Sequence, residues 1–338
     1  MAKFFVTGGL GFIGSNLIEY LLNTGHNVIN IDKISYASNF YNTKEFKNNK
    51  SYKFYKSDIC NKKNLNYLIK KYKPKCIFNL AAETHVDRSI DNSDSFIKSN
   101  ILGVQSLLEV LVKNKRTKLI HISTDEVYGN IKKNVRTTEK SPYNPLNPYA
   151  ATKAASDHLV RSYINTYKIN AIITNSCNNY GPRQNPEKLI PKIIFNILYN
   201  KKNLPIYAKG KNSREWIYVL DHCQALYKIY QKGKNGETYN IGSNHNLKNI
   251  DLVKKIISLC KNKKKINIKS QIKFIKDRPG HDLRYALNSK KIRSKIKWST
   301  KVNISKGLLR TIEWYQNNKK FYKLIKNKNF INRLGQRK

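Results

Sequence analysis

The sequence predicts an α/β fold in which a doubly wound parallel sheet is followed by a smaller C-terminal α/β domain. Three observations favour this class. Short runs of β-branched and aromatic residues alternate with helical patterns in the first half of the chain. A glycine-rich turn follows the first of these runs directly. With 338 residues, 40% of them hydrophobic, the chain is long enough for two modest domains or one large one.

The expected elements follow one another as strand, helix, strand. Lys3–Thr7 is a short β-branched and aromatic run, and the apolar residues between Phe12 and Leu22 recur on one helical face. Gly25 ends that helix. Further strands are expected at 27–31, 52–55, 76–81 and 119–123, with a helix at 94–113. Strands that alternate with helices form βαβ units with right-handed crossovers, and therefore a parallel sheet.

The regular alternation weakens from about Asn175, because four prolines between 182 and 205 interrupt the chain. We therefore expect a nucleotide-binding domain at 1–177, with a later segment near 215–242 packed onto it. A substrate-binding domain is expected at 178–330. The Lys- and Asn-rich stretch from Phe321 to Lys338 is expected to pack loosely.

Composition excludes several classes of protein. The net charge is +44, but 53 of the 65 basic residues are lysines spread along the whole chain. No long basic block with interleaved aromatic residues occurs, so we attribute the charge to genome composition and expect no specific nucleic-acid partner. The five cysteines lack paired spacing, which argues against disulfides and a metal site. Without a signal peptide or a run of about 18 apolar residues, we expect a cytoplasmic protein with no membrane partner.

The glycine-rich turn is Gly8-Gly9-Leu10-Gly11-Phe12-Ile13-Gly14, between a strand and a helix. Glycine lets the backbone approach a pyrophosphate, and the helix N-terminus offers N–H donors. In this context the pattern predicts a Rossmann-type dinucleotide site. Asp32 ends the second strand, where a carboxylate binds the ribose hydroxyls and favours NAD over NADP. Lys33 beside it weakens that preference.

Tyr149 and Lys153 lie one helical turn apart, after the helix-starting pair Asn147-Pro148. A tyrosine hydroxyl has an ordinary pKa of about 10, and a nearby ammonium group brings it towards the range of a general base. Such pairs are often only surface packing. The dinucleotide turn upstream favours the catalytic interpretation.

Both motifs together resemble the extended short-chain dehydrogenase/reductase family, whose dehydrogenases, epimerases and dehydratases use the Tyr/Lys pair to remove a hydroxyl proton as hydride leaves carbon. Thr124-Asp125-Glu126 follows the strand at 119–123. Two adjacent carboxylates suit an elimination, in which one takes a carbon-bound proton and the other protonates the departing oxygen. A solvated acidic turn is the alternative.

Longer stretches sharpen the resemblance to the dTDP-glucose 4,6-dehydratases, from Val6 to about Trp314. These stretches are 81–90, 121–129, 178–182, 186–191 and 277–282. Among the small departures, Leu10 replaces the usual Ala and Glu215 the usual Asp. The resemblance implies conversion of dTDP-glucose to its 4-keto-6-deoxy form, in the synthesis of deoxysugars such as rhamnose. A nucleotide-sugar 4-epimerase, or a 4,6-dehydratase of another nucleotide sugar, stays open as an alternative.

The resemblance also implies a role for each catalytic residue. Tyr149, assisted by Lys153 and Thr124, would deprotonate the sugar 4-hydroxyl while hydride passes to NAD. Glu126 would take the C5 proton, and Asp125 would protonate the departing C6 hydroxyl. Because NAD is regenerated in each cycle, it should stay bound as a prosthetic group.

Two sets of binding residues and a homodimer, associated through helices of the NAD domain, are implied in the same way. No metal is expected. The residues implied around NAD are Gly8, Gly11, Phe12, Ile13, Gly14, Asp32, Lys33, Ser35, Asp58, Ile59, Leu80, Ala81, Ala82, Ser99, Tyr149, Lys153 and Asn179. Those implied around dTDP-glucose are Thr84, Thr124, Asn178, Lys188, Leu189, Pro205, Tyr207, Arg214, Asn249, Arg278 and His281.

Overall fold

A seven-stranded sheet is the centre of the computed structural model, which describes residues 1–199, 201–263 and 268–325. Its strand order is β10-β6-β5-β4-β1-β2-β3, and all neighbouring strands are parallel. The strands are β1 (Lys3–Thr7), β2 (Asn27–Asp32), β3 (Tyr52–Lys56), β4 (Cys76–Asn79), β5 (Lys118–Thr124), β6 (Ala171–Ser176) and β10 (Thr238–Ile241). The expected Rossmann-type doubly wound sheet is confirmed.

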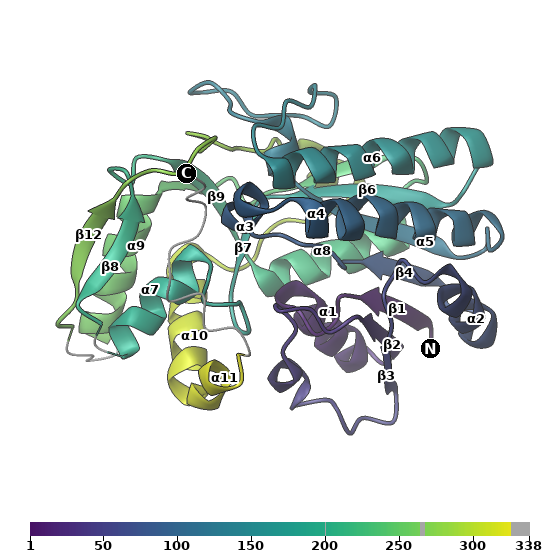
Figure 1. Ribbon diagram of the computed structural model, residues 1–338, viewed down its shortest axis with the longest axis horizontal. Helices are drawn as coiled ribbons and strands as arrows, with labels where there is room; N and C mark the ends of the chain where they lie inside the picture. The colour runs from purple at the N-terminus through teal and green to yellow at the C-terminus, as the bar shows by residue number, and fades with distance from the viewer. Residues whose placement is uncertain (200, 264–267, 326–338) are drawn as a thin grey trace.

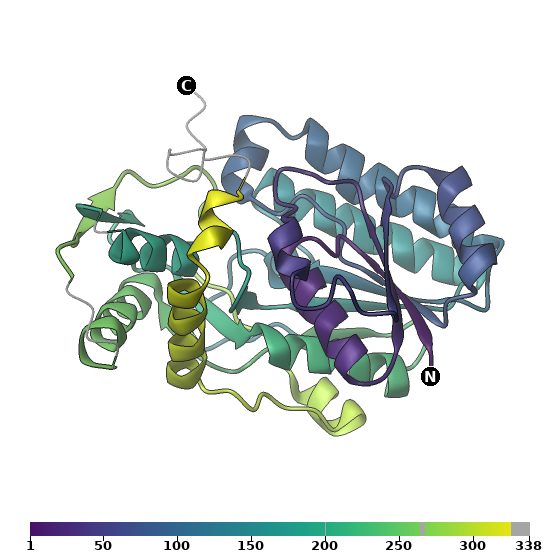
Figure 2. The same ribbon diagram turned by 90° about the horizontal axis from the view of Figure 1, so that it is seen from below.

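Helices cover both faces of this sheet, because successive residues of a strand point to opposite sides. In β1, Phe4 and Val6 belong to one hydrophobic core and Phe5 to another. Residues of α1 (Phe12–Asn23) and α8 (Val219–Lys232) complete the first core. Residues of α2 (Lys62–Tyr72), α5 (Gly103–Val112) and α6 (Pro148–Tyr167) complete the second. Figure 2 shows the blue helices on one side of the strands and the purple and green helices, which include α1 and α8, on the other.

The helix expected at 94–113 is interrupted in the structure. It consists of α4 (Asp94–Phe96), a π-helical turn η2 (Ile97–Leu102) and α5. The whole stretch Asp94–Val112 is long and apolar enough to cross a membrane by length and composition. However, 56% of its most apolar 18-residue segment is buried inside the protein, which is typical of a helix in the protein core.

A smaller lobe, on the left in Figure 1, forms around a separate hydrophobic core. Its strands are β7 (Asn178–Tyr180), β9 (Ser213–Tyr218) and β11 (Asn246–Lys248) in one sheet, and the parallel pair β8 (Asn203–Tyr207) and β12 (Gln271–Ile275). Its helices are α7 (Leu189–Leu198), α9 (Asn249–Ser258), α10 (Ile304–Asn317) and α11 (Lys319–Lys323). Figure 2 shows α10 and α11 in yellow along one side of this lobe.

The end of the described chain corrects one expectation. Phe321 and Tyr322 are buried in the core of the smaller lobe, so the chain does not pack loosely from Phe321 onward. Two large aromatic side chains bury enough apolar surface to fix this segment despite its lysine content. The same expectation also covered residues 326–338, which lie outside the described residues.

The chain returns to the large sheet after entering the smaller lobe. β10 pairs with β6, α8 packs against α1, and Leu287, Ile292 and Trp298 join the first core. The remaining short elements are η1 (Phe40–Thr43), α3 (Val86–Asp91), η3 (Asp125–Tyr128), η4 (Leu259–Lys263) and η5 (Ile292–Ile296). The division into domains at residue 177 stays a prediction.

Candidate active site

A cavity of about 810 Å³ lies at the carboxyl ends of the sheet strands and extends to residues of the smaller lobe. This is where α/β sheets hold their ligands. All the residues expected around NAD or the nucleotide sugar line it, including Thr124, Tyr149 and Lys153, and so does Glu126. Of the expected catalytic residues, only Asp125 does not contribute to the lining. The fold therefore brings the expected residues together, and their individual roles stay predictions.

The glycine turn packs backbone directly against backbone. Gly8 has a φ of 70°, in the left-handed region that glycine favours, and a Cβ there would lie 2.9 Å from the backbone of Leu80 and Ala81. A Cβ on Gly14 would lie 2.4 Å from the carbonyl oxygen of Gly8. The α1 N-terminus, at Gly11, has no side-chain cap. These features fit a pyrophosphate, which needs close backbone approach and free N–H donors.

Replacing Gly14 by Ala should lower the free energy of unfolding by about 1–3 kcal/mol and reduce the NAD that copurifies with the protein. The reason is that the Gly8 carbonyl is backbone and cannot move aside as a side chain can. Denaturant unfolding and release of NAD on denaturation measure the two effects. Gly11→Ala is the matched control, since its nearest contact would be 3.2 Å. Equal losses in both variants would contradict the close packing at Gly14.

Asp32 is buried at the end of β2 and shapes the ribose end of the cavity. Its carboxylate accepts hydrogen bonds from Leu10 N (3.0 Å), Ile34 N (2.8 Å) and Ser38 Oγ (2.7 Å). Lys33 Nζ donates to Ser99 Oγ at 2.6 Å and lies 4.0 Å from Glu83. Because Lys33 has these partners, it is less free to attract a 2′-phosphate, so the geometry supports NAD.

Tyr149 and Lys153 stand on the first turns of α6, which Asn147 caps by accepting a hydrogen bond from Ala150 N at 2.9 Å. Lys153 Nζ donates to the carbonyl of Ile122 at 2.8 Å. Burial lowers the pKa of Lys153 to about 8, although the charge of Asp157 opposes this.

The pKa of Tyr149 is raised, first by burial and then by Glu126, although a hydrogen bond with Thr124 lowers it. A nearby Lys153 ammonium group was expected to lower the pKa of Tyr149, but the pKa is raised in this structure. Burial disfavours the charged phenolate, and a nearby negative charge disfavours it further. A bound cation beside Tyr149 would favour the phenolate.

Activity should fall as the pH rises above about 8, because Lys153 acts as a cation and loses its proton there. The pH dependence of kcat/KM measures this, since it reports groups of the free enzyme. Asp157 raises the pKa of Lys153, so Asp157→Asn should move this alkaline limb to lower pH. If the alkaline limb lies at the same pH in the wild type and in Asp157→Asn, the assignment of this limb to Lys153 is wrong.

Thr124, Asp125 and Glu126 stand where β5 passes into η3. Thr124 Oγ1 accepts a hydrogen bond from Glu126 N at 3.3 Å and donates one to Asp125 Oδ1 at 3.3 Å. Asp125 is 2% exposed, and its Oδ2 has no hydrogen-bond partner among the described residues. Burial and the charges of Glu126 and Glu215 raise the pKa of Asp125 well above its usual range. A carboxyl group in this environment holds its proton to a higher pH than an exposed aspartate does, which suits a proton donor.

Glu126 lines the cavity, and its Oε2 lies 3.4 Å from both Asn147 Nδ2 and the hydroxyl of Tyr285. The Tyr285 hydroxyl also contacts Asp282 Oδ2, so its single hydrogen is donated to one of the two carboxyl groups at a time. The Arg214 guanidinium lies 4.3 Å from the centre of the Tyr285 ring. Sequence reasoning missed Tyr285, which lies three residues after the stretch 277–282. A single aromatic residue there has no pattern that would mark it.

Cationic side chains reach the cavity from three distant segments, namely Lys188, Arg214 and Arg278. Lys188 Nζ donates to the Thr84 carbonyl at 2.7 Å, and Arg278 pairs with Asp87 at 2.8 Å. Together the three cationic side chains form the kind of cluster that binds a diphosphate, because two phosphates need several cationic donors. His281 bonds Asp277 at 2.5 Å and meets the Tyr207 ring edge-on at 5.8 Å.

A second cluster that sequence reasoning missed joins Tyr36, Arg88 and Glu187. Glu187 accepts hydrogen bonds from Tyr36 at 3.2 Å and from Arg88 at 3.3 Å. The Arg88 guanidinium also lies 3.9 Å from the centre of the Tyr36 ring. The cluster ties the loop after β2 to α3 and to the segment before α7. Nothing in the sequence spacing indicates this meeting, which only the fold produces.

The doubly wound sheet, the glycine turn and the buried Tyr149–Lys153 pair together define an NAD-type enzyme of the extended short-chain dehydrogenase/reductase class. Residues 5–311 match the family model described as GDP-mannose 4,6 dehydratase. The chain belongs to this family of nucleotide-sugar 4,6-dehydratases.

Individual relatives agree with this membership. The dTDP-glucose 4,6-dehydratase of Haemophilus influenzae is 46% identical over 332 residues, which cover 93% of this chain and 98% of the relative. The crystal structure of the Bacillus anthracis dTDP-glucose 4,6-dehydratase in complex with NAD is 39% identical, with a TM-score of 0.88 and coverage of 96% and 100%. The Streptomyces venezuelae enzyme of that name, also with NAD bound, is 37% identical, with a TM-score of 0.89 and the same coverage. A UDP-glucose 4-epimerase from Thermotoga maritima is more distant, at 27% identity and a TM-score of 0.84.

Proposed function

We propose that this protein converts dTDP-glucose to dTDP-4-keto-6-deoxyglucose, with NAD as its bound cofactor, in the synthesis of dTDP-deoxysugars. One observation carries the proposal: the carboxylate of Glu126 and the pair Tyr149–Lys153 line the same cavity as the dinucleotide turn, and the adjacent Asp125 is buried with a raised pKa. A 4-epimerase needs the dinucleotide turn and the Tyr/Lys pair but neither carboxyl group. The three more similar relatives named above are dTDP-glucose 4,6-dehydratases, and the epimerase is more distant, which supports the same choice.

The protein's own residues then have distinct tasks. Tyr149 takes the proton of the sugar 4-hydroxyl, and Lys153 stabilises the phenolate that this requires. Bound NAD supplies the acceptor for the C4 hydride and returns that hydride to C6. The 4-ketone acidifies the C5 proton, which Glu126 removes and gives back to C5 when hydride reaches C6. Asp125 gives its proton to the C6 oxygen as it leaves as water. At the end of the cycle Tyr149 releases the proton that it took, and Asp125 regains one from solvent. The net reaction is loss of one water, so the enzyme is a lyase.

The substrate-side residues divide by chemistry. Lys188, Arg214 and Arg278 neutralise the diphosphate, and Thr84 with Asn178 faces the hexose. Leu189, Pro205, Tyr207, Asn249 and His281 surround the nucleotide. The division follows the resemblance to the family, and the fact that all of these residues line the cavity supports it.

Incubation of the purified protein with dTDP-glucose and no added reductant tests this function. We expect a product lighter by one water, without net accumulation of NADH, as measured by mass spectrometry and by the alkaline absorbance of the 4-keto sugar. UDP-glucose and GDP-mannose in parallel reactions test the choice of nucleotide sugar. An isomerised sugar of unchanged mass would show an epimerase instead.

We also propose a cytoplasmic homodimer that associates through the outer face of the helix Asp94–Val112. Ile97 and Leu102, at the two ends of η2 on that stretch, are 43% and 48% exposed and offer apolar surface for such an association. Light scattering during gel filtration measures the assembly. A monomer at all concentrations would contradict it.

A further inference from the structure

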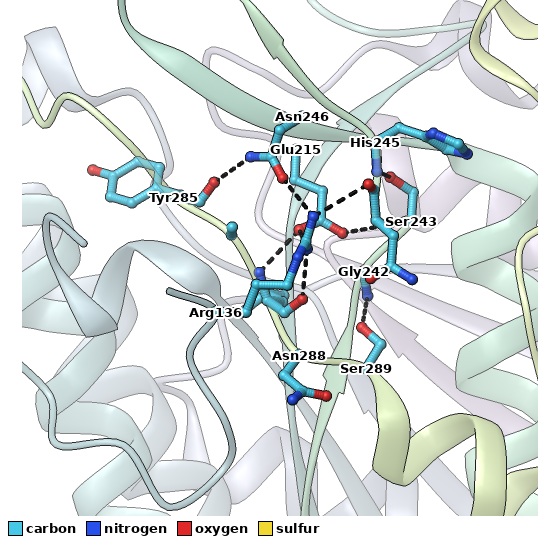
Figure 3. Close-up of polar contacts among 12 residues, drawn as sticks. Arg136, Glu215, Gly242, Ser243, His245, Asn246, Tyr285, Asn288 and Ser289 are labelled. Carbon is cyan, nitrogen blue, oxygen red and sulfur yellow. Dashed lines mark hydrogen bonds and ion pairs between the residues drawn. The ribbon is translucent and has the colours of Figure 1, made fainter. Parts of the chain in front are cut away.

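An ion pair joins the buried Glu215 to the half-buried Arg136, and neither residue lines the cavity (Figure 3). Glu215 has no exposed surface, and its Oε2 accepts a hydrogen bond from Arg136 Nη1 at 3.0 Å. It also accepts from the backbone of Leu287 at 2.9 Å and of Asn244 at 2.5 Å. A Cβ on Gly242 would lie 2.5 Å from Glu215 Oε1, so glycine there leaves room for the carboxylate.

Arg136 continues the network into two other segments. It donates to the Leu287 carbonyl at 2.9 Å, to the Asn244 carbonyl at 3.2 Å and to Asn246 Oδ1 at 2.9 Å. Asn246 in turn donates to the Tyr285 carbonyl at 2.6 Å. Figure 3 shows the two charged groups facing each other among these segments. The pair thus ties β9 to the turn before β11 and to the chain at 285–287.

The tied segments carry the groups that surround Glu126. Arg214 lines the cavity, and the adjacent residue Glu215 points to the opposite side of β9, as strand geometry requires. Arg214 lies against the Tyr285 ring and donates to the Asp282 carbonyl at 2.8 Å. The Tyr285 hydroxyl contacts both Asp282 and Glu126. Displacing the chain at 285–287 would therefore move the group that orients the C5 base.

Glu215 is also one of the charges that act on Asp125. The others are Glu126 on η3 and Arg214 on β9, while the hydroxyls of Thr124 and Tyr149 and the thiol of Cys177 are the nearby neutral groups. Glu126 and Glu215 raise the pKa of Asp125, and Arg214 lowers it. Arg136 is 30% exposed, so it offsets the charge of Glu215 only in part.

Stability alone gives a weak reason for such a pair, because desolvation of a buried ion pair cancels much of its attraction. We propose that the Glu215–Arg136 pair is a positioning device for the elimination step of the proposed dehydration. It holds the segment 285–287 so that Tyr285 orients Glu126, and the charge of Glu215 keeps Asp125 in its proton-donating form. This inference rests on the proposed function of the same cavity.

Infrared spectroscopy of the NAD-loaded enzyme gives a direct test. The carbonyl band of protonated Asp125 is identified by its absence in Asp125→Asn, and its intensity is followed against pH in Glu215→Gln and Arg136→Met. Glu237→Gln, which removes a carboxylate from a surface pair with Lys291, is the matched control. kcat and KM for dTDP-glucose and the melting temperature are measured for each protein.

We expect the Asp125 band to titrate at lower pH in Glu215→Gln, because a negative charge is lost. It should titrate at higher pH in Arg136→Met, because the charge of Glu215 is then no longer offset. kcat of Glu215→Gln should fall about 10- to 100-fold with a smaller change in KM, since proton transfer in the transition state is impaired. Glu237→Gln should titrate as the wild type does.

An unmoved band in Glu215→Gln, or shifts of the same sign in both variants, would overturn the proposal and leave the pair a purely structural contact. If Glu215→Gln does not fold, Arg136→Met is sufficient to test the proposal, because the Asp125 band must move to higher pH in that variant. A wild-type enzyme that removes no water from dTDP-glucose would refute the proposed function instead. The infrared titration does not depend on turnover, so the two failures are distinguishable.

Discussion

Replacing Glu126 by Gln should reduce formation of the 4-keto-6-deoxy sugar by about 10²–10⁴-fold, the usual contribution of a placed general base. The amide keeps the shape of the side chain, and its oxygen can still accept from Asn147 and Tyr285, but it cannot take the C5 proton. Product formation by mass spectrometry and deuterium exchange at C5 in D₂O measure the loss.

Asp125→Asn is the matched comparison for this prediction. It should keep C5 exchange and lose release of water, because Asp125 acts on the C6 oxygen and not on C5. If Glu126→Gln still exchanges the C5 proton at the wild-type rate, Glu126 is not the base that removes this proton. Unimpaired turnover with unchanged product mass would establish the epimerase alternative.

Replacing Tyr149 by Phe should reduce oxidation at C4 by about 10²–10⁴-fold, since the proposed acceptor of the 4-hydroxyl proton, one helical turn from Lys153, is then lost. Every later step requires the 4-ketone, so C5 exchange should disappear with product formation. Single-turnover measurement of bound NADH after mixing with dTDP-glucose reports the oxidation step directly.

The control for Tyr149→Phe is Tyr128→Phe. Tyr128 is equally buried and donates to Asn240 Oδ1 at 2.9 Å, but it does not line the cavity. This variant should lose stability without losing C4 oxidation. Oxidation that survives in Tyr149→Phe would show that another group accepts the proton.

Local sequence patterns were sufficient to predict most strands of the large sheet. Its first strand was expected at Lys3–Thr7 and has those bounds, and the strand expected at 119–123 extends by one residue at each end. These runs are apolar because both faces of a parallel sheet are covered, so burial leaves a signal in the sequence itself. The strand expected at 76–81 ends earlier, at Asn79, because the chain turns into the cavity there.

Contacts between distant segments left no such signal. The helix expected at 94–113 contains a π-helical turn, which hydrophobic periodicity does not reveal. Phe321 and Tyr322 are buried although the surrounding composition suggested a loose tail. In both cases the outcome depends on the surfaces that pack against the segment, which are remote in sequence.

By itself, the sequence determined the fold class, the dinucleotide turn and the set of residues that meet in one cavity, because each depends on short-range spacing or on motifs with a specific chemistry. Only the tertiary structure decided the electrostatics of that cavity. It placed Asp125 behind the wall, raised its pKa by burial and by the charge of Glu215, and brought Tyr285 to Glu126. Burial and charge act through space, so residues 90 or 159 positions apart become neighbours only when the chain has folded.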